Sequence, residues 1–208
     1  MQKKTNYFKA FGLLVLLTAP NFASNTFRFQ TSFDPNKHDA YIHELEFISK
    51  KKLFTHIAKI ESRGAYNVVS EKSMLGKYQA SKHTLRDFGY SDAQIDSIYT
   101  SVYEITIRGN RKRYFFDTEL FPPSEQERFI RWYTNRMERI LLKYHINEYV
   151  GKTIDGVFIT KAGLLHASML GHTHVIRFLE TQGAVNYTPK RGYSVKERLQ
   201  QLENFELH

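Results

Sequence analysis

The fold is decided at residues 53–64, which read LFTHIAKIESRG. Phe54, Ile57, Ala58 and Glu61 follow the i, i+3, i+4, i+7 spacing that places side chains on one buried face of an α-helix. A carboxylate at the end of such an apolar stripe loses hydration, which makes its ionised form costly. The pattern therefore predicts a helix whose last buried residue is a glutamate with a raised pKa.

Helix-capping residues punctuate the chain on both sides of this stretch. The helical pattern begins at Tyr41, and the polar segment 62–75 predicts a loop with a short extended piece at 68–69. Serine and threonine are favoured N-caps, glycine is a favoured C-cap, and a glutamate three residues after the cap completes a capping box. These signals predict helix boundaries at Ser81, Gly89, Ser91, Thr160 and Gly171, and capping boxes at Ser124 with Glu127 and Ser194 with Glu197.

Two further patterns fill in the fold class. One apolar stripe predicts a long helix that starts after the Pro122-Pro123 stop, and its residues are Phe129, Trp132, Tyr133, Met137, Ile140, Leu141 and Tyr144. Val102, Ile105 and Ile107 instead alternate imperfectly, as in a strand, and the Gly109-Asn110 turn that follows them predicts a β-hairpin returning through 114–116. We expect a mainly α domain of the α+β type, bilobal, with a small β-hairpin beside a cleft.

The N-terminus has the organisation of a secretory signal. Lys3, Lys4 and Lys9 precede a ten-residue apolar run that is too short to span a membrane, and small residues follow at Ala23 and Ser24. We expect a signal peptide over 1–23, a polar arm over 24–40 and one domain over 41–208. The mature protein should then be periplasmic or extracellular, with no stable membrane anchor.

Composition narrows the partners. The chain has no cysteine, which rules out a disulfide framework, and its net charge is +9. Without the three leader lysines, 27 basic residues stand against 21 acidic ones, a net charge of +6. Such a positive surface favours binding to an anionic polymer, but the charge does not identify which polymer. Basic residues cluster at 50–52 and 108–113, but no nucleic-acid module accompanies them, so nucleic acid is not the expected partner.

Two blocks of sequence resemble a known family. Glu61-Ser62-Arg63-Gly64 is followed by Gly76-Lys77-Tyr78-Gln79, and an Ala-rich segment at 159–171 ends in glycine. Together they resemble the lysozyme-like superfamily, and within it the lytic transglycosylases and phage-type muramidases, over roughly residues 53–179. The resemblance implies cleavage of peptidoglycan between N-acetylmuramic acid and N-acetylglucosamine, without a cofactor.

The resemblance also assigns roles to residues. It implies that Glu61 is the general acid and base, that Ser62 orients the glutamate or the substrate, and that Tyr78 and Gln79 line the sugar cleft. Many transglycosylases carry Tyr-Asn where this chain has Ser168-Met169, and there the tyrosine contacts the glutamate. Ser168 is therefore a candidate substrate contact, and the missing tyrosine would be replaced by water or by Tyr78, Tyr187 or Tyr193.

A second carboxylate decides the reaction subtype. A hydrolase needs one to activate water or to stabilise an intermediate, whereas a transglycosylase lets the sugar's own hydroxyl attack. Glu71, in the polar loop after Glu61, is the candidate. Because that loop favours a solvated side chain, we expect a transglycosylase, with a hydrolytic muramidase as the alternative.

Other functions remain open at this stage. The departure at 168–169 favours a non-catalytic peptidoglycan-binding component of an envelope or secretion assembly, and a protein inhibitor is a further conceivable partner. A nucleic-acid binder would rest on charge alone. His166, His172 and His174 include an i, i+2 pair with a third histidine nearby, which can supply zinc. No carboxylate or cysteine lies close to them in the sequence, so we expect no metal.

Overall fold

The computed structural model describes residues 35–208 except 72, 191, 206 and 208, and it places side chains for residue 46 and from 49 onward. The predicted leader over 1–23 and the first part of the arm, up to residue 34, lie outside the described residues. Within the described chain, helices predominate and the β component is small, which confirms the mainly α fold class. The α-helices are α1 (Pro35–Ser62), α2 (Lys82–Phe88), α3 (Asp92–Thr100), α4 (Pro123–Lys143), α5 (Lys161–Ala167), α6 (His172–Glu180) and α7 (Val195–Gln200).

Helix α1 begins earlier than predicted. The pattern placed its start at Tyr41, but the helix already runs from Pro35, so the end of the expected polar arm is helical. Proline fits the first turn of a helix because its φ is already helical and its missing N–H has no partner there. At the other end, Arg63 and Gly64 both have a positive φ, +58° and +84°, and Gly64 N–H donates to the Ala58 carbonyl at 3.0 Å. This left-handed backbone ends the helix after Ser62.

Most predicted caps are confirmed, and one is wrong. Ser81 and Ser91 cap α2 and α3, Thr160 caps α5, and Ser194 with Glu197 forms the capping box of α7. Ser124 is not a cap, because α4 already starts at Pro123, one residue before Ser124, and its N-cap is Pro122. The Glu127 side chain is bound by another part of the chain, as described below.

The predicted hairpin is confirmed. Strands β2 (Tyr103–Ile107) and β3 (Arg111–Phe115) pair antiparallel, and β1 (Val68–Val69) adds to β3, which gives the sheet order β1-β3-β2. A second hairpin, β4 (Thr153–Ile154) with β5 (Val157–Phe158), turns through Asp155-Gly156, a favoured pair for a two-residue hairpin loop. Its signal was not recognised in the sequence.

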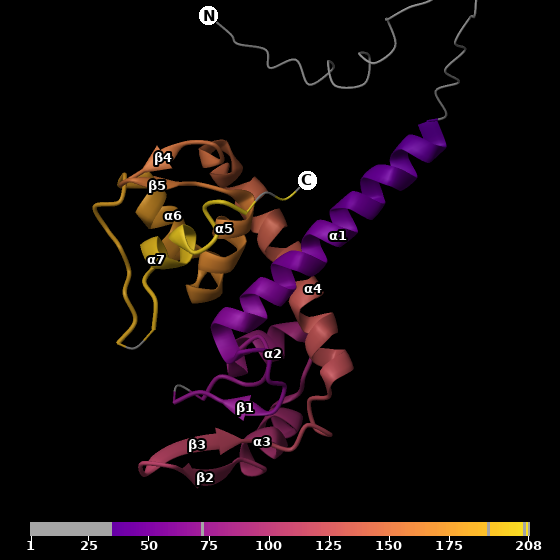
Figure 1. Ribbon diagram of the computed structural model, residues 1–208, viewed down its shortest axis with the longest axis vertical. Coiled ribbons are helices and arrows are strands. Elements are labelled where there is room, and N and C mark those ends of the chain that lie inside the picture. Colours follow the sequence, from indigo (N-terminus) through magenta and orange to yellow (C-terminus); the bar gives the residue numbers. More distant parts are fainter. Residues whose placement is uncertain (1–34, 72, 191, 206, 208) are drawn as a thin grey trace, which may run out of the picture.

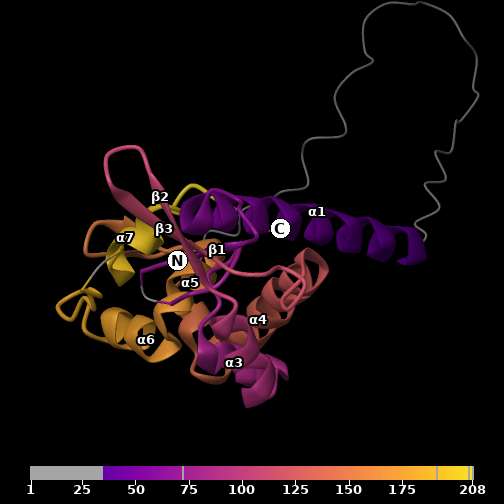
Figure 2. The same cartoon turned by 90° about the horizontal axis from the view of Figure 1, so that it is seen from below.

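Two groups of elements lie on either side of the α1 and α4 helices. Figure 1 shows α5, α6, α7 and the β4–β5 hairpin on one side, and α2, α3 and the three-stranded sheet around the C-terminal end of α1. In the turned view, the β2–β3 hairpin reaches outward near that same end of α1 (Figure 2). One core of buried apolar side chains joins the two groups, and it includes Leu53 and Ile57 of α1 with Phe129 and Ile130 of α4.

The stripe of α4 is largely confirmed, since Phe129, Tyr133, Met137 and Leu141 are buried on one face. Tyr144 is an exception because it lies just after the helix and is 49% exposed. Within the part of the chain that the structure describes, no helix combines the length and apolar character needed to cross a membrane.

Candidate functional site

Glu61 lies where two adjoining cavities meet at the C-terminal end of α1. The cavities measure about 310 Å³ and 450 Å³, and Ile60, Glu61, Ser70, Glu71 and Gln79 line both of them. We call the two together the Glu61 groove. Its shared lining joins three residues that the sequence singled out, namely Glu61, Glu71 and Gln79.

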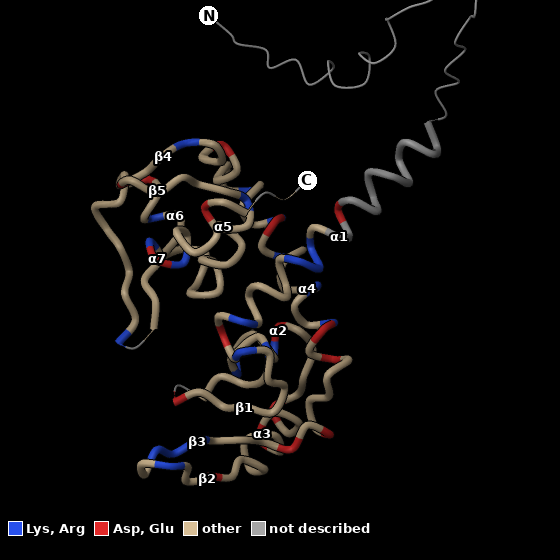
Figure 3. The backbone as a smooth tube through the Cα atoms, viewed as in Figure 1, with Lys and Arg blue, Asp and Glu red and all other residues tan. Residues whose placement is uncertain are grey.

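The groove has two unlike walls. The smaller cavity is lined by Lys112, Arg113 and Tyr114 of strand β3, where basic residues gather at the end of the hairpin (Figure 3). The larger one is lined on its other side by one arginine, Arg198, and by uncharged residues. The uncharged residues are Met169, Leu170, Pro189, Gly192 and Tyr193. An elongated ligand would thus meet positive charge on the hairpin side and mostly apolar surface on the other.

Two side chains from distant parts of the chain hold the Glu61 carboxylate. Arg198 Nη1 of α7 lies 2.5 Å from Glu61 Oε1, and His166 Nε2 of α5 lies 3.1 Å from the same oxygen. All three side chains are nearly inaccessible, with 11% exposure for Glu61 and Arg198 and none for His166. The glutamate is therefore part of a buried charged cluster built by α1, α5 and α7.

This cluster overturns the predicted pKa of Glu61. Burial on its own raises the pKa, as the sequence suggested, but the hydrogen bond to His166 and the charge of Arg198 together outweigh it and lower the pKa below its ordinary value. Glu61 is consequently ionised in this structure at neutral pH. The apolar stripe predicted the burial of Glu61, but no sequence pattern predicted that Arg198 of α7 would lie beside it.

His166 is kept neutral in the same cluster. Its burial lowers its pKa, and the nearby Arg198 charge acts in the same direction, while Glu61 opposes both. A neutral ring that donates to Glu61 through Nε2 leaves Nδ1 as an acceptor, and Nδ1 has no hydrogen-bond partner among the described residues. The histidine thus acts as a fixed donor to Glu61.

Ser62 and Gln79 line the groove, and both also anchor the loop that follows α1. The Ser62 hydroxyl donates to the Lys77 carbonyl at 2.8 Å, which ties the helix end to the 76–79 segment. Gln79 takes a left-handed backbone conformation and donates through Nε2 to the Gly76 carbonyl at 2.8 Å. Its Oε1 accepts no hydrogen bond from a described residue, which leaves an acceptor for a ligand.

Two predicted substrate contacts do not fit. Tyr78 is 2% exposed and its hydroxyl donates to Glu127, in a different cavity from that of Glu61. Ser168 is completely buried, and its hydroxyl donates to the Leu164 carbonyl one helical turn earlier at 2.7 Å. Neither side chain is placed to touch a sugar in the Glu61 groove.

Among the described residues, no tyrosine hydroxyl donates to Glu61. Of the alternatives, Tyr193 lines the groove, Tyr187 stacks on the His174 ring at 3.7 Å, and Tyr78 donates to Glu127. Tyr133, which was not among the alternatives, is buried and donates to the Ser168 carbonyl. His166 and Arg198 take the place of the expected tyrosine. In the sequence, His166 was a candidate only as a metal ligand, and Arg198 was not a candidate. No local motif marks Arg198 as a partner of Glu61, because it is one charged residue of a C-terminal helix.

In the described ranges, no three His, Cys, Asp or Glu side chains form a group that could hold a metal ion. Of the other two histidines considered for zinc, His172 packs against Tyr144, and His174 against Tyr187 as noted above. Comparisons with protein-family models, with curated proteins and with solved structures found no match.

Proposed function

We propose that this protein cleaves the glycan strands of peptidoglycan between N-acetylmuramic acid and N-acetylglucosamine, with Glu61 as general acid and base. The observation that carries the proposal is a carboxyl group, 11% exposed, at the junction of two cavities that also hold Glu71 and Gln79. Glycosidic cleavage uses such a carboxyl group to protonate the leaving oxygen. The signal-like leader supports access to the cell wall.

The ionised resting state imposes a condition on this mechanism. Glu61 can donate a proton only when it holds one, and the Arg198 ion pair opposes protonation. Arg198 lines the same cavity, so sugar hydroxyl and acetamido oxygens that enter it compete for the guanidinium. Once Arg198 is drawn away, the burial of Glu61 raises its pKa and it takes up the proton that it gives to the leaving oxygen.

The reaction then follows one of two routes. In the transglycosylase route, which we favour, the sugar's own C6 hydroxyl attacks, Glu61 takes the proton of that hydroxyl, and a 1,6-anhydro end forms. In the hydrolytic route a water attacks instead, with Glu71 as the second carboxylate. The presence of Glu71 in both cavities supports the hydrolytic alternative more strongly than its sequence context did.

A non-catalytic glycan-binding role is the second candidate. The Arg198–Glu61 ion pair favours it, because a carboxylate held permanently ionised serves recognition rather than proton transfer. The two candidates differ in whether the wall is cut.

Digestion of purified peptidoglycan, followed by mass spectrometry of the released muropeptides, tests the proposal. The wild type should release products, Glu61→Gln should release none, and Glu180→Gln, an exposed glutamate of α6, should behave as the wild type. Products lighter by one water than the hydrated forms identify the transglycosylase. Hydrated ends that disappear in Glu71→Gln identify the hydrolase.

A folding control is required because Glu61→Gln leaves Arg198 buried without its anion. The double variant Glu61→Gln/Arg198→Gln removes both charges, which is far less costly than removing one. If both variants are folded by circular dichroism and still cut the wall, Glu61 is not the catalytic acid. A wild type that sediments with the wall but releases nothing supports the binding role.

A further inference from the structure

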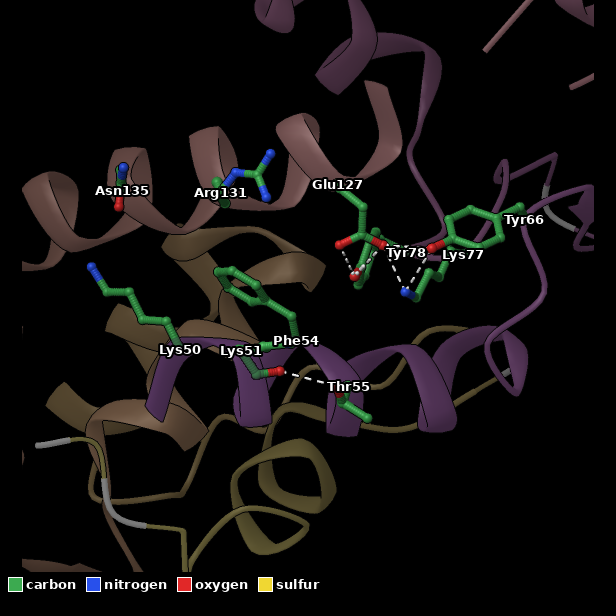
Figure 4. Close-up of a pocket in the computed structure, with 10 residues that line it drawn as sticks. All are labelled: Lys50, Lys51, Phe54, Thr55, Tyr66, Lys77, Tyr78, Glu127, Arg131 and Asn135. Atoms are coloured by element: carbon green, nitrogen blue, oxygen red, sulfur yellow. Dashed lines mark hydrogen bonds and ion pairs between the residues drawn. The ribbon is translucent and has the colours of Figure 1, made fainter. Parts of the chain in front are cut away.

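A third cavity lies between the middle of α1 and the first half of α4, and we call it the α1–α4 pocket. It measures about 430 Å³ and shares no lining residue with the Glu61 groove. Figure 4 shows α4 facing Phe54 and Thr55 of α1 across it, with Tyr66, Lys77 and Tyr78 gathered at one end. None of the functions proposed above uses this pocket.

The end of the pocket that Tyr66, Lys77, Tyr78 and Glu127 form is densely hydrogen-bonded and close to neutral. Glu127 accepts hydrogen bonds from the Tyr66 hydroxyl at 2.8 Å, from Lys77 Nζ at 2.6 Å and from the Tyr78 hydroxyl at 2.9 Å. Lys77 Nζ also lies over both tyrosine rings, 4.7 Å and 5.2 Å from their centroids. Lys77 thus balances the Glu127 charge, and the rings present a fixed aromatic end.

The rest of the lining is cationic. Lys51, Arg131 and Asn135 are exposed, and their side chains form no hydrogen bond or ion pair with another described residue. Lys50 differs because it pairs with Glu46 at 3.0 Å and Glu138 at 3.5 Å. Two cations and one amide are therefore available to a ligand, and the two cations favour an anionic one.

The spacing of these groups suits an extended chain. Glu127, Arg131 and Asn135 stand on successive turns of α4 and span about 12 Å at 1.5 Å per residue. An extended peptide of about four residues covers the same length at roughly 3.3 Å per residue. A lone phosphate ion would fill only a small part of the cavity and would leave Phe54 and the tyrosine rings without contacts.

We propose that the α1–α4 pocket binds a short acidic peptide. Arg131 and Lys51 hold its carboxylates, Asn135 hydrogen-bonds its backbone, and its apolar part lies against Phe54 and Tyr66. Free peptides and the stem peptides of the cell wall share this chemistry. The proposal does not depend on cleavage by Glu61.

Isothermal titration of the purified protein with four probes tests the site and its source. The probes are the wall tripeptide L-Ala-γ-D-Glu-meso-diaminopimelate, acetyl-Ala-Glu-Glu-amide, acetyl-Ala-Gln-Gln-amide and inorganic phosphate. At least one acidic peptide should bind about tenfold or more tightly than the neutral peptide and phosphate. Tighter binding of the wall tripeptide identifies stem peptides as the source, and tighter binding of the linear peptide identifies ordinary peptides. Equal affinity for the neutral peptide or phosphate, or no binding at all, overturns the proposal.

Matched variants localise the binding. Arg131→Gln and Lys51→Gln should each weaken it roughly tenfold, because each loses one charge-assisted contact. Arg139→Gln on α4 and Lys52→Gln on α1 are controls, since both residues are exposed, are absent from the pocket and form no described ion pair. Equal losses in the controls, or unchanged binding in the test variants, would show that the pocket is not the site. Glu61→Gln should leave the peptide affinity unchanged, which separates this proposal from the catalytic one.

Discussion

At the scale of the residue, opposing interactions set the protonation state of one carboxyl group, that of Glu61. Burial favours the protonated form of Glu61, whereas Arg198 and His166 favour the ionised form, and in this structure the latter two prevail. A buried ion pair of this kind adds little net stability, but removing one partner is costly because the other remains charged and desolvated. Stability and acidity at this site are therefore coupled and can be measured together.

Arg198→Gln should raise the pKa of Glu61 and destabilise the fold by about 3 kcal/mol at neutral pH. In the wild type the lowered pKa of Glu61 contributes stability above about pH 4.5, and this is lost as the pH falls through the folded value. In the variant the Arg198 charge is gone while the His166 hydrogen bond remains, so burial weighs more on the pKa of Glu61 and acid should relieve part of the cost. Urea unfolding at neutral and acidic pH checks this, with exposed Arg139→Gln as the control. A constant difference between wild type and variant at all pH values would contradict it.

His166 should give the wild type a second acid-sensitive window. Its folded pKa is lowered, so its contribution to stability is complete above about pH 6.5 and falls with pH below that value. The slope should approach about 1.4 kcal/mol per pH unit, the value for one proton. His166→Gln, which keeps a donor for Glu61, should reduce this slope in unfolding measurements between about pH 5 and pH 7. Part of the slope should remain, because burial also lowers the pKa of His172. Substitution of His83, whose side chain is 80% exposed, should leave the slope intact.

At the scale of the element, one glutamine positions the loop after α1 against α4. The buried Gln126 side chain accepts from Lys77 N–H at 2.7 Å and donates to the Tyr66 and Phe121 carbonyls at 2.9 Å and 2.8 Å. Gly76 packs directly on this side chain, and a Cβ there would lie 2.2 Å from Gln126 Oε1. The same loop carries Gln79 into the Glu61 groove and Lys77 into the α1–α4 pocket.

Gly76→Ala should therefore destabilise the fold by about 3 kcal/mol or more, from left-handed strain and from loss of the Gln126 hydrogen bonds. Gly64→Ala is the matched control. Gly64 also has a positive φ, but a Cβ there meets nothing within 4 Å, so its cost should be about 1 kcal/mol. Thermal unfolding of both variants measures the difference. Equal losses would mean that Gln126 adapts without cost.

The elements that sequence predicted well are those with local signals. Each confirmed N-cap side chain accepts a hydrogen bond from a backbone N–H three residues later, so the residues that give the signal also form the contact. These caps are Ser81, Ser91, Thr160 and Ser194. Ser124 and Glu127 carry the same spacing, but tertiary partners from 49 and more positions away claim the Glu127 carboxylate. A capping box is lost when its acid finds stronger donors elsewhere in the fold.

At the scale of the whole molecule, the candidate site depends on contacts that no short motif encodes. The motifs around residues 61 and 76–79 predicted that Glu61, Ser62 and Gln79 lie in one groove, and all three line the smaller cavity. They could not reveal that Tyr78 faces α4, that Ser168 turns inward or that Arg198 reaches Glu61, because each depends on how distant helices pack. The contribution of the hairpin charges also depends on tertiary structure, because Lys112 and Arg113 act on the site only by lining the groove.

The basic hairpin should make wall binding salt-dependent. Attraction between exposed charges is screened over about 10 Å at 0.1 M salt and about 3 Å at 1 M. Sedimentation with peptidoglycan should therefore fall as salt rises, and less steeply for Arg111→Gln/Arg113→Gln. Arg139→Gln/Arg177→Gln removes the same charge from exposed positions outside the groove and should keep the wild-type dependence. Binding to uncharged chitin should change little, and equal salt effects on both polymers would exclude steering by the hairpin.

The ion pair between Glu61 and Arg198 also makes the titration of one carboxyl group a reporter of folding. The pair joins the end of α1 to the last described helix, so it can form only after Arg198 has been synthesised and α7 has docked. Contacts so distant in sequence carry a large loop-closure cost and tend to form late. Before docking, Glu61 lacks the Arg198 charge, so its pKa is higher than in the complete fold, and docking of α7 lowers it. A carbon-13 label on this side chain would then follow the completion of the site during refolding.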